Sequence, residues 1–319
     1  MIASLVLSAL FAPLLQGLIK SAKARLQMRQ GPPLLQPYAD LWKLFRKGAV
    51  VPETSSSVFR FAPWVVLGSS FAAAGLVPTL TTGYLAAGLG GYLAAGSGGQ
   101  SGVGDALLFV GLLALGRFAL ALAAIDTGSN FAHMGASREM AIAAVVEPAL
   151  VGTLFALGLA AGTTDLGMLA GARAADGLAA ALEPGAWLAL AALVIVALAE
   201  TGRVPVDNPD THLELTMAHE GMLLEYSGRP LGLLHYASQV KQIAVLGLIG
   251  SLFLPWTLGG GSTLVGLVGW AAKLAGLGLG LAVIESANAK LRILRLPDLL
   301  ATAAALGGLS LVARGVLGP

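Results

Sequence analysis

The sequence predicts an all-α polytopic membrane protein with about eight transmembrane helices, one additional amphipathic interfacial helix, and both termini on the outer side. Three observations predict this class. Hydrophobic residues make up 56% of the 319 positions and charged residues 11%, against about a quarter in soluble proteins, and the mean hydropathy is +0.80. Apolar stretches have close to the length that crosses a bilayer. Basic residues gather in alternate links between these stretches, as cytoplasmic loops do.

Composition also excludes several classes of function. The formal net charge of +2 is too small to predict nucleic acid binding. The chain has no cysteine, which excludes disulfides, thiolate zinc sites and cysteine-held iron–sulfur clusters. We therefore expect electron-carrying centres to lie in other subunits, and residues 1–319 to form a single membrane domain.

The first span is predicted at residues 1–19, which are apolar and uncharged. Four basic residues follow it: Lys20, Lys23, Arg25 and Arg29. A secretory signal peptide carries its positive charges in front, so this order predicts an uncleaved span with its N-terminus outside. Segment 20–60 holds eight of the nineteen basic residues and is therefore predicted to be cytoplasmic.

An amphipathic helix is predicted inside this segment, after the helix-breaking sequence R-Q-G-P-P. Leu34, Tyr38, Leu41 and Phe45 recur at helical spacing, and Gly48 ends the pattern. Such a helix is expected to lie in the membrane interface. A simple surface anchor is the favoured role, and a roof over a cavity entrance is the alternative.

The other spans follow from the same criteria of length and charge. A tandem duplication of eight residues at 83–98 is uncharged and is expected to be an external insertion. The remaining spans are predicted at 61–82, 103–126, 139–161, 186–199, 236–254, 264–284 and 299–317. The predicted cytoplasmic loops are 20–60, 127–138, 200–235 and 285–297.

We single out three ionisable residues inside predicted spans, where charge is costly and commonly functional. Arg117 in span three and Glu147 in span four lie about 12 to 14 Å from the cytoplasmic end at 1.5 Å per residue. They are at the right depth to pair, either as a structural ion pair or as part of a proton relay. Lys273 lies about 18 Å deep by the same measure and requires a carboxylate or a wet cavity.

The loop from Ala199 to Arg229 is the acidic centre of an otherwise nearly charge-free region. Gly202, Pro205 and Pro209 predict a folded turn that presents Glu200, Arg203 and Asp207. Clustered acids opposed by arginines suit proton exchange, and a solvated docking loop is the alternative. A zinc site at His212, Glu214, His219 and Glu220 is disfavoured, because the histidines lack the i, i+4 spacing of a metalloprotease. The acidic residues of the loop from Ala199 to Arg229 are Glu200, Asp207, Asp210, Glu214, Glu220 and Glu225.

Four motifs resemble the first membrane subunit of respiratory complex I, which forms the quinone chamber. They are R-L-Q-M-R-Q-G-P, L-L-Q-P-Y-A-D-L-W-K-L-F, A-E-T-G-R-V-P-V-D and L-E-Y-S-G. The resemblance covers nearly the whole chain. It departs where complex I has E-T-N-R-x-P-F-D, and where the stretch between Leu215 and Glu225 is about three residues longer. The sequence P-V-D-N-P-D-T-H-L-E-L-T-M is instead similar to the membrane subunit of formate hydrogenlyase and hydrogenase-4.

This resemblance implies a membrane anchor in the cytoplasmic membrane of a prokaryote. The implied partners are a nickel–iron hydrogenase-like large subunit, an iron–sulfur small subunit and antiporter-like membrane subunits, and the implied role is to link their redox chemistry to proton or sodium movement. The nickel–iron centre and the clusters are then expected in the partner subunits, and this chain is expected to hold no cofactor by itself. The alternative is a quinone-binding subunit with a quinone in the chamber. A stand-alone ion transporter using Glu147 and Lys273 is disfavoured, because no inverted repeat is visible.

The resemblance also assigns candidate residues. Arg25 and Arg29 are expected near the chamber entrance. The proton path or chamber is expected to use the following residues, of which Glu147 and Glu220 come from the charge pattern alone: Glu139, Glu147, Glu200, Arg203, Asp207, Glu214, Glu220 and Glu225.

Overall fold

The structure is a computed structural model that describes residues 2–78, 105–176, 183–207, 217–254, 263–292 and 295–317. These residues are almost entirely helical, and the β pairing found among them is one isolated bridge between Asp105 and Asp165. The helices are α1 (Ile2–Leu26), α2 (Gln36–Arg46), α3 (Ser57–Leu76), α5 (Ala106–Asp126), α6 (Asn130–Ala161), α7 (Leu166–Asp176), α9 (Pro184–Glu200), α10 (His219–Leu223), α11 (Gly228–Phe253), α12 (Thr263–Ala287) and α13 (Leu296–Leu317).

The all-α membrane class is confirmed. Six helices in the described residues are long and apolar enough to cross a bilayer, namely α1, α3, α5, α6, α12 and α13. Helix α9 is apolar but has only 17 residues, and α11 has 26 residues and packs within the same bundle. The number of eight spans and the outward orientation of the termini stay predictions.

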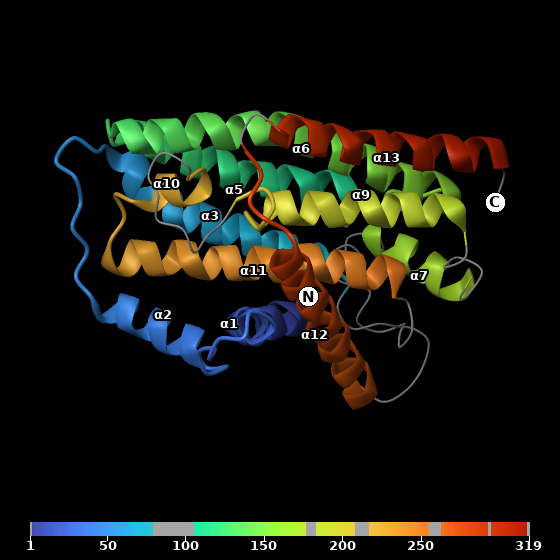
Figure 1. Ribbon diagram of the computed structural model, residues 1–319, viewed down its shortest axis with the longest axis horizontal. Helices are drawn as coiled ribbons and strands as arrows, with labels where there is room; N and C mark the ends of the chain where they lie inside the picture. Colours follow the sequence, from blue (N-terminus) through green and yellow to red (C-terminus); the bar gives the residue numbers. More distant parts are fainter. Residues whose placement is uncertain are drawn as a thin grey trace.

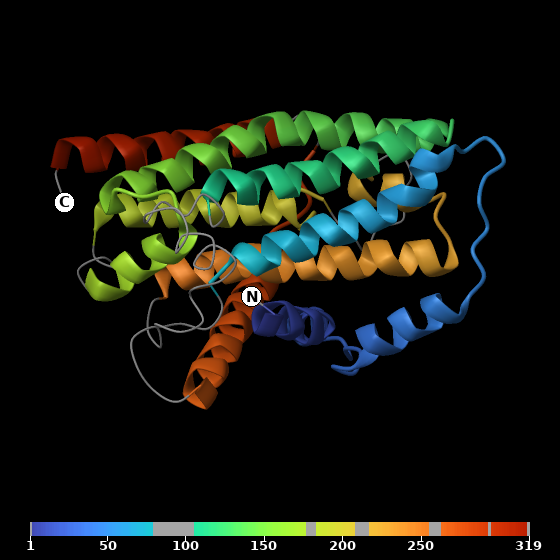
Figure 2. The same cartoon turned by 180° about the vertical axis from the view of Figure 1, so that it is seen from behind.

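Helices α3, α5, α6, α9, α11 and α13 run roughly along the long axis of the molecule, whereas α1 and α12 cross it (Figure 1). The long bundle contains α3, α5, α6, α9, α11 and α13, in which α6 packs on α13 and α3 lies between α5 and α11. Helices α1 and α12 pack against each other and incline steeply to this bundle (Figure 2). The short α2 lies beside α11 at the end of the bundle that also carries α10.

Small residues let these helices approach one another closely. Ala73, Ala123, Ala156, Ala189 and Ala237 are fully buried between helices. Lipid tails are as apolar as the helices, so close van der Waals packing holds a membrane bundle together, and small side chains favour it. Polar side chains buried in the same bundle therefore stand out as candidates for function.

Several helices extend past the predicted ends of the spans. Helix α1 extends to Leu26, α6 begins at Asn130 instead of 139, and α11 begins at Gly228 instead of 236. Charged residues mark the cytoplasmic side but do not end a helix, since Lys and Arg are good helix formers. The predicted external link at 162–185 contains α7, whose Leu166 and Leu169 are buried.

One part of the expected topology lies outside the described residues. Span two was expected to reach residue 82, and α3 ends at Leu76. The tandem duplication at 83–98 and the candidate residue Glu214 lie outside the described ranges.

Candidate functional site

A folded turn follows α9 and places three buried charged side chains. Gly202 adopts a left-handed conformation with φ of 58°, which a residue without a side chain adopts at low cost. The Arg203 N–H then donates to the Leu198 carbonyl at 2.9 Å, and the Asp207 N–H donates to the Arg203 carbonyl at 3.1 Å. The predicted turn is thus present. Glu200, Arg203 and Asp207 are each buried.

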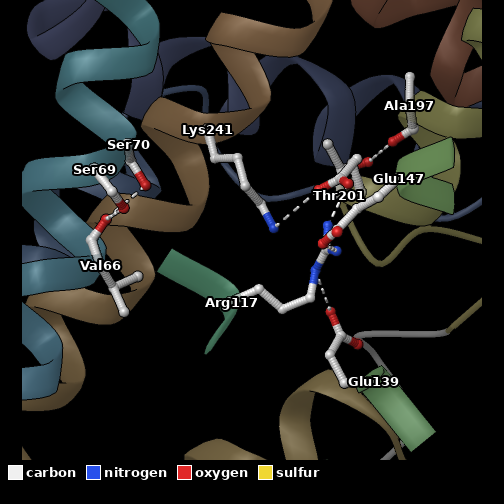
Figure 3. Close-up of polar contacts among 10 residues, drawn as sticks. Val66, Ser69, Ser70, Arg117, Glu139, Glu147, Ala197, Thr201 and Lys241 are labelled. Atoms are coloured by element: carbon white, nitrogen blue, oxygen red, sulfur yellow. Dashed lines mark hydrogen bonds and ion pairs between the residues drawn. The ribbon is translucent and has the colours of Figure 1, made fainter. Parts of the chain in front are cut away.

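Arg117 on α5 forms the centre of what we call the inner charge cluster: Arg117, Glu139, Glu147, Glu200 and Lys241. Its Nη1 donates to Glu147 Oε1 at 2.6 Å, and its Nη2 donates to Glu200 Oε1. Its Nε lies 3.8 Å from Glu139 Oε1. The pairing of Arg117 with Glu147 that their depths predicted is therefore confirmed. Figure 3 shows the side chains of Arg117, Glu139, Glu147 and Lys241 converging from three helices.

The inner charge cluster contains one more acid than base. Lys241 on α11 is the second base, with its Nζ 3.9 Å from Glu200 Oε2. That oxygen is buried and has no hydrogen-bond partner among the described residues. The side chain of Glu147 is 34% exposed and that of Glu200 is 1% exposed, so the three acids differ in their contact with solvent.

Arg203 forms a second cluster, which we call the wall cluster, with Glu285, Lys23, Gln16 and Gln242. Its Nη1 donates to Glu285 Oε1 at 2.9 Å, and its Nη2 donates to Gln242 Oε1 at 2.9 Å and also to Gln16 Oε1. Lys23 Nζ lies 3.2 Å from Glu285 Oε2. Because these residues come from α1, α11, α12 and the turn after α9, the cluster ties the inclined helices to the long bundle.

Asp207 connects the turn to α10. Its Oδ2 accepts from the backbone N–H groups of Ala218 and His219, each at 3.2 Å. Its Oδ1 accepts from Lys290 Nζ at 2.8 Å. The carboxylate thereby satisfies backbone donors at the start of a helix, which is the usual role of a capping acid.

A chamber of about 600 Å³ lies between α1, α2, α10, α11 and the turn after α9. Its volume falls within the range of small-molecule sites, about 300 to 1,000 Å³. One face of α11 supplies a polar strip to its wall, at i, i+3, i+4 and i+7. The buried Gln239 Oε1 and Gln242 Nε2 have no hydrogen-bond partner in the described part of the chain. The strip consists of His235, Ser238, Gln239 and Gln242.

Helix α2 forms the roof of this chamber. Its Asp40, Leu41 and Leu44 line the cavity, while Trp42 on the opposite side is 61% exposed. The structure shows that this helix roofs a cavity, and its role as a membrane-surface anchor stays a prediction. The exposed Trp42 is well placed to lie in a membrane interface.

The roof is held at both ends by close backbone approaches. A Cβ added at Gly17 of α1 would lie 2.0 Å from the Leu34 carbonyl oxygen, and one at Gly228 would lie 2.3 Å from that of Gly48. The Val50 N–H donates to Ser227 Oγ at 2.8 Å beside the second approach. The segment 34–48 is therefore fixed to α1 at its start and to α11 at its end.

A smaller void of about 30 Å³, here called the inner void, lies between the chamber and the inner charge cluster. Arg117, Glu139 and Lys241 line it from the cluster side. His219, Leu223 and Ser238 line both the inner void and the chamber. The two cavities thus share a wall segment made by α10 and α11.

His219 is held in its neutral form. Burial lowers its pKa to about 4, the positive charges of Lys241 and Arg117 act in the same direction, and the acids Asp207 and Glu200 oppose them. Burial also raises the pKa of Tyr38 in α2, whose hydroxyl donates to the Leu10 carbonyl.

The structure brings most of the predicted site residues together, but not all. Glu220 lines the chamber, and Glu225 is partly exposed and belongs to neither cluster. Arg25 and Arg29 are exposed and do not line the chamber, so their place at its entrance stays a prediction. Lys273 is buried on α12, and no described carboxylate pairs with it.

Sequence reasoning missed several charged residues of the site, among them Lys20, Lys23, Lys241, Glu285 and Lys290. Lys241 lies within span six and was detectable by the same rule that identified Lys273. Glu285 lies one residue beyond the predicted end of span seven, where a carboxylate looks like an ordinary boundary charge. Lys20, not Arg25 or Arg29, is the basic residue of α1 that lines the chamber.

Comparison with known proteins gives consistent matches. A family model described as NADH dehydrogenase matches residues 1–313. The chain is 34% identical to formate hydrogenlyase subunit 4 of Escherichia coli K12, over 92% of this chain and 90% of that protein. It is 35% identical to hydrogenase-4 component C of the same organism, over 80% of this chain and 75% of that protein. Its fold is similar to that of a chain in the membrane-bound sulfane sulfur reductase, an archaeal respiratory membrane complex. The TM-score is 0.79 and the sequences are 21% identical, and the match covers 97% of this chain and 96% of that chain.

Proposed function

Because this chain belongs to the NADH dehydrogenase family, we propose that it is the membrane-anchor and coupling subunit of a redox complex of the formate hydrogenlyase or hydrogenase type. In this role it docks a hydrophilic electron-transfer arm on the chamber side of the bundle. It links the redox chemistry of that arm to the translocation of protons or sodium ions. The sequence identity to formate hydrogenlyase subunit 4 and hydrogenase-4 component C over most of the chain supports a hydrogenase-type complex.

The observation that carries the proposal is the inner charge cluster, buried in the membrane bundle and separated from the chamber by one small void. Buried charges in a membrane protein are costly, and a protein that keeps several of them together commonly uses them to move ions. With every member ionised the cluster carries one more negative than positive charge, so binding one proton brings it to neutrality. A change of charge in the chamber is therefore felt by the cluster as a change in proton affinity.

The wall cluster and Asp207 supply the connection to the arm. Arg203, Asp207 and Glu220 lie in the chamber wall, where a docked partner or an ion in the chamber alters their surroundings. The chain has no cysteine and therefore leaves electron transfer to partners that carry the nickel–iron centre and the iron–sulfur clusters. Antiporter-like membrane subunits are the expected route by which the ion leaves the cluster.

A quinone-binding role is the second candidate, and the unpartnered amides favour it. The volume of the chamber suits a quinone headgroup, and Gln242 Nε2 can donate to one of its carbonyl oxygens. A bound quinone would accept electrons there, and the residues of this chain would hold it and exclude water. The hydrogenase branch needs no such ligand.

A single purification separates these candidates. We would attach an affinity tag to this chain in its native host and isolate its complex in mild detergent. Co-purified nickel together with hydrogen evolution from a reduced dye supports the first candidate. Flavin and quinone reduction in place of nickel support the second, and a lone chain that transports ions in liposomes contradicts both.

A further inference from the structure

His219 occupies the wall that the chamber shares with the inner void. We infer that His219 is the residue that passes protons between the chamber and the inner charge cluster. This inference rests on the proposed coupling function and names the group that carries one step of it.

The geometry selects His219 from the shared wall. Three described residues line both cavities: His219, Leu223 and Ser238. Leu223 is apolar and cannot exchange a proton. The Ser238 hydroxyl can orient a water molecule, but its own proton is not released near neutral pH. An imidazole has two ring nitrogens, so it can take up a proton at one and release a proton from the other.

The surroundings hold the position of this residue while leaving space beside it. Asp207 accepts from its backbone N–H at 3.2 Å. Gly202 stands next to it, and a Cβ added there would lie 3.7 Å from the His219 Cβ. The charged groups around it lie on several elements. Asp207, which is paired with Lys290, lies in the chamber wall with Glu220 and Arg203, and Arg117, Glu139 and Lys241 line the void. The charge of Glu200 also acts on His219.

The transfer step balances without any redox partner. One ring nitrogen of the neutral imidazole takes a proton from water in the chamber, and the other releases its proton to water in the inner void. A void of about 30 Å³ has room for about two water molecules, each needing about 10–15 Å³. The ring is left neutral in its other tautomer. Rotation about the Cβ–Cγ bond then turns the protonated nitrogen towards the void and the bare nitrogen towards the chamber, ready for the next proton. A pKa of about 4 is consistent with this path, because the cation is not trapped on the ring near pH 7.

The test uses the complete complex in liposomes, with redox turnover driven by a reduced dye and ion transport followed by a membrane-potential dye. His219→Ala and His219→Gln should lower transport per turnover by about 100-fold, the scale of one general acid–base group, while the dye-driven redox rate changes less than transport does. His133→Gln is the matched control, because His133 is exposed and lines neither the chamber nor the inner void. It should retain transport.

Chemical rescue separates proton transfer from a structural role. Imidazole fits the chamber and should restore transport to His219→Ala. 1-Methylimidazole has similar basicity but only one nitrogen that can carry a proton, and should not restore it. Transport that is unchanged in His219→Gln, lost equally in His133→Gln, or rescued equally by both bases overturns the inference. If the unmodified complex turns over without transport, the proposed coupling function itself fails. If the alanine variant does not assemble, the glutamine variant decides the result.

Discussion

Arg117 on α5 donates a hydrogen bond to the carboxylate of Glu200 at the end of α9, and their side chains are 5% and 1% exposed. Glu147, which Arg117 also contacts, is 34% exposed. Removing one partner of a buried ion pair typically lowers the free energy of unfolding by about 3–5 kcal/mol, because a buried charge is left without its partner. We therefore expect Glu200→Ala to destabilise the complex more than Glu147→Ala does. Thermal unfolding of the purified complex measures both, and equal losses would refute the ranking.

The same contact predicts a specific double-mutant cycle. Arg117→Ala leaves Glu139, Glu147 and Glu200 facing one another without their central cation, so accumulation in the membrane should fall strongly. Adding Glu200→Ala removes the most buried of these acids, and part of the loss should be recovered. Adding Glu147→Ala should recover less, because water already reaches that side chain. Additive losses in both double variants would mean that the residues do not interact.

The two carboxylate oxygens of Asp207 are expected to have different roles. Oδ2 holds the backbone of the turn, and Oδ1, paired with Lys290, takes part in coupling. Asp207→Asn keeps an oxygen that accepts from the Ala218 and His219 N–H groups, but it loses the charge that pairs with Lys290. The complex should assemble, and transport per turnover should fall. Asp207→Ala should also lower the unfolding temperature, since an unsatisfied buried donor costs about 1–3 kcal/mol. Asp40→Asn, in the chamber roof, is the control, and poor assembly with normal transport in the Asn variant would indicate a docking role.

The two glycines that hold the roof should not tolerate a methyl group. Gly17→Ala places a carbon 2.0 Å from a backbone oxygen, and Gly228→Ala adds strain at a φ of 54° to an approach of 2.3 Å. Each should lower the unfolding temperature, with a cost of at least about 1–3 kcal/mol. Gly68→Ala, in a helix with nothing within 4 Å of the added Cβ, should be neutral or stabilising. Equal unfolding temperatures for all three variants would show that the roof is not held there.

The pH dependence of stability should report His219. Its pKa is about 4 in the folded protein and ordinarily 6.5, so the unfolded chain binds more protons between these values. The stabilising contribution of the neutral ring is therefore present above pH 6.5 and is lost as the pH falls towards 4, to a total of about 3 kcal/mol. His219→Gln should flatten the loss of thermal stability over this window. A variant with the same pH profile as the unmodified complex would contradict the shifted pKa.

The predicted orientation can be tested directly, because the chain has no cysteine of its own. Glu53 and Asp176 are exposed residues on links predicted to lie inside and outside, respectively. In intact cells, an impermeant maleimide should label Asp176→Cys and should label Glu53→Cys only after the membrane is opened. Labelling of both cysteines from the same side would contradict the predicted topology.

Sequence patterns predicted what depends on distance along a helix and missed what depends on which helices are neighbours. The depths of Arg117 and Glu147 follow from rise per residue, and their pairing was found. The contact of Arg117 with Glu200, 83 positions away, depends on where α5 and α9 stand in the bundle, which hydropathy does not encode. Helix α2 shows the same limit, because periodicity identifies an apolar face but not the chamber that it covers.

The two ends of the chamber roof become available at very different times during synthesis. Tyr38 bonds to the Leu10 carbonyl and Leu34 packs on Gly17, so the first attachment needs only the beginning of the chain. The second attachment joins Gly48 to Gly228 and Val50 to Ser227, 177 positions apart. A ribosome adding about 5–20 residues per second needs roughly ten seconds or more to supply those partners. Until then α11, which also supplies a wall of the chamber, is absent, so the chamber and the second attachment of its roof form together, late in synthesis.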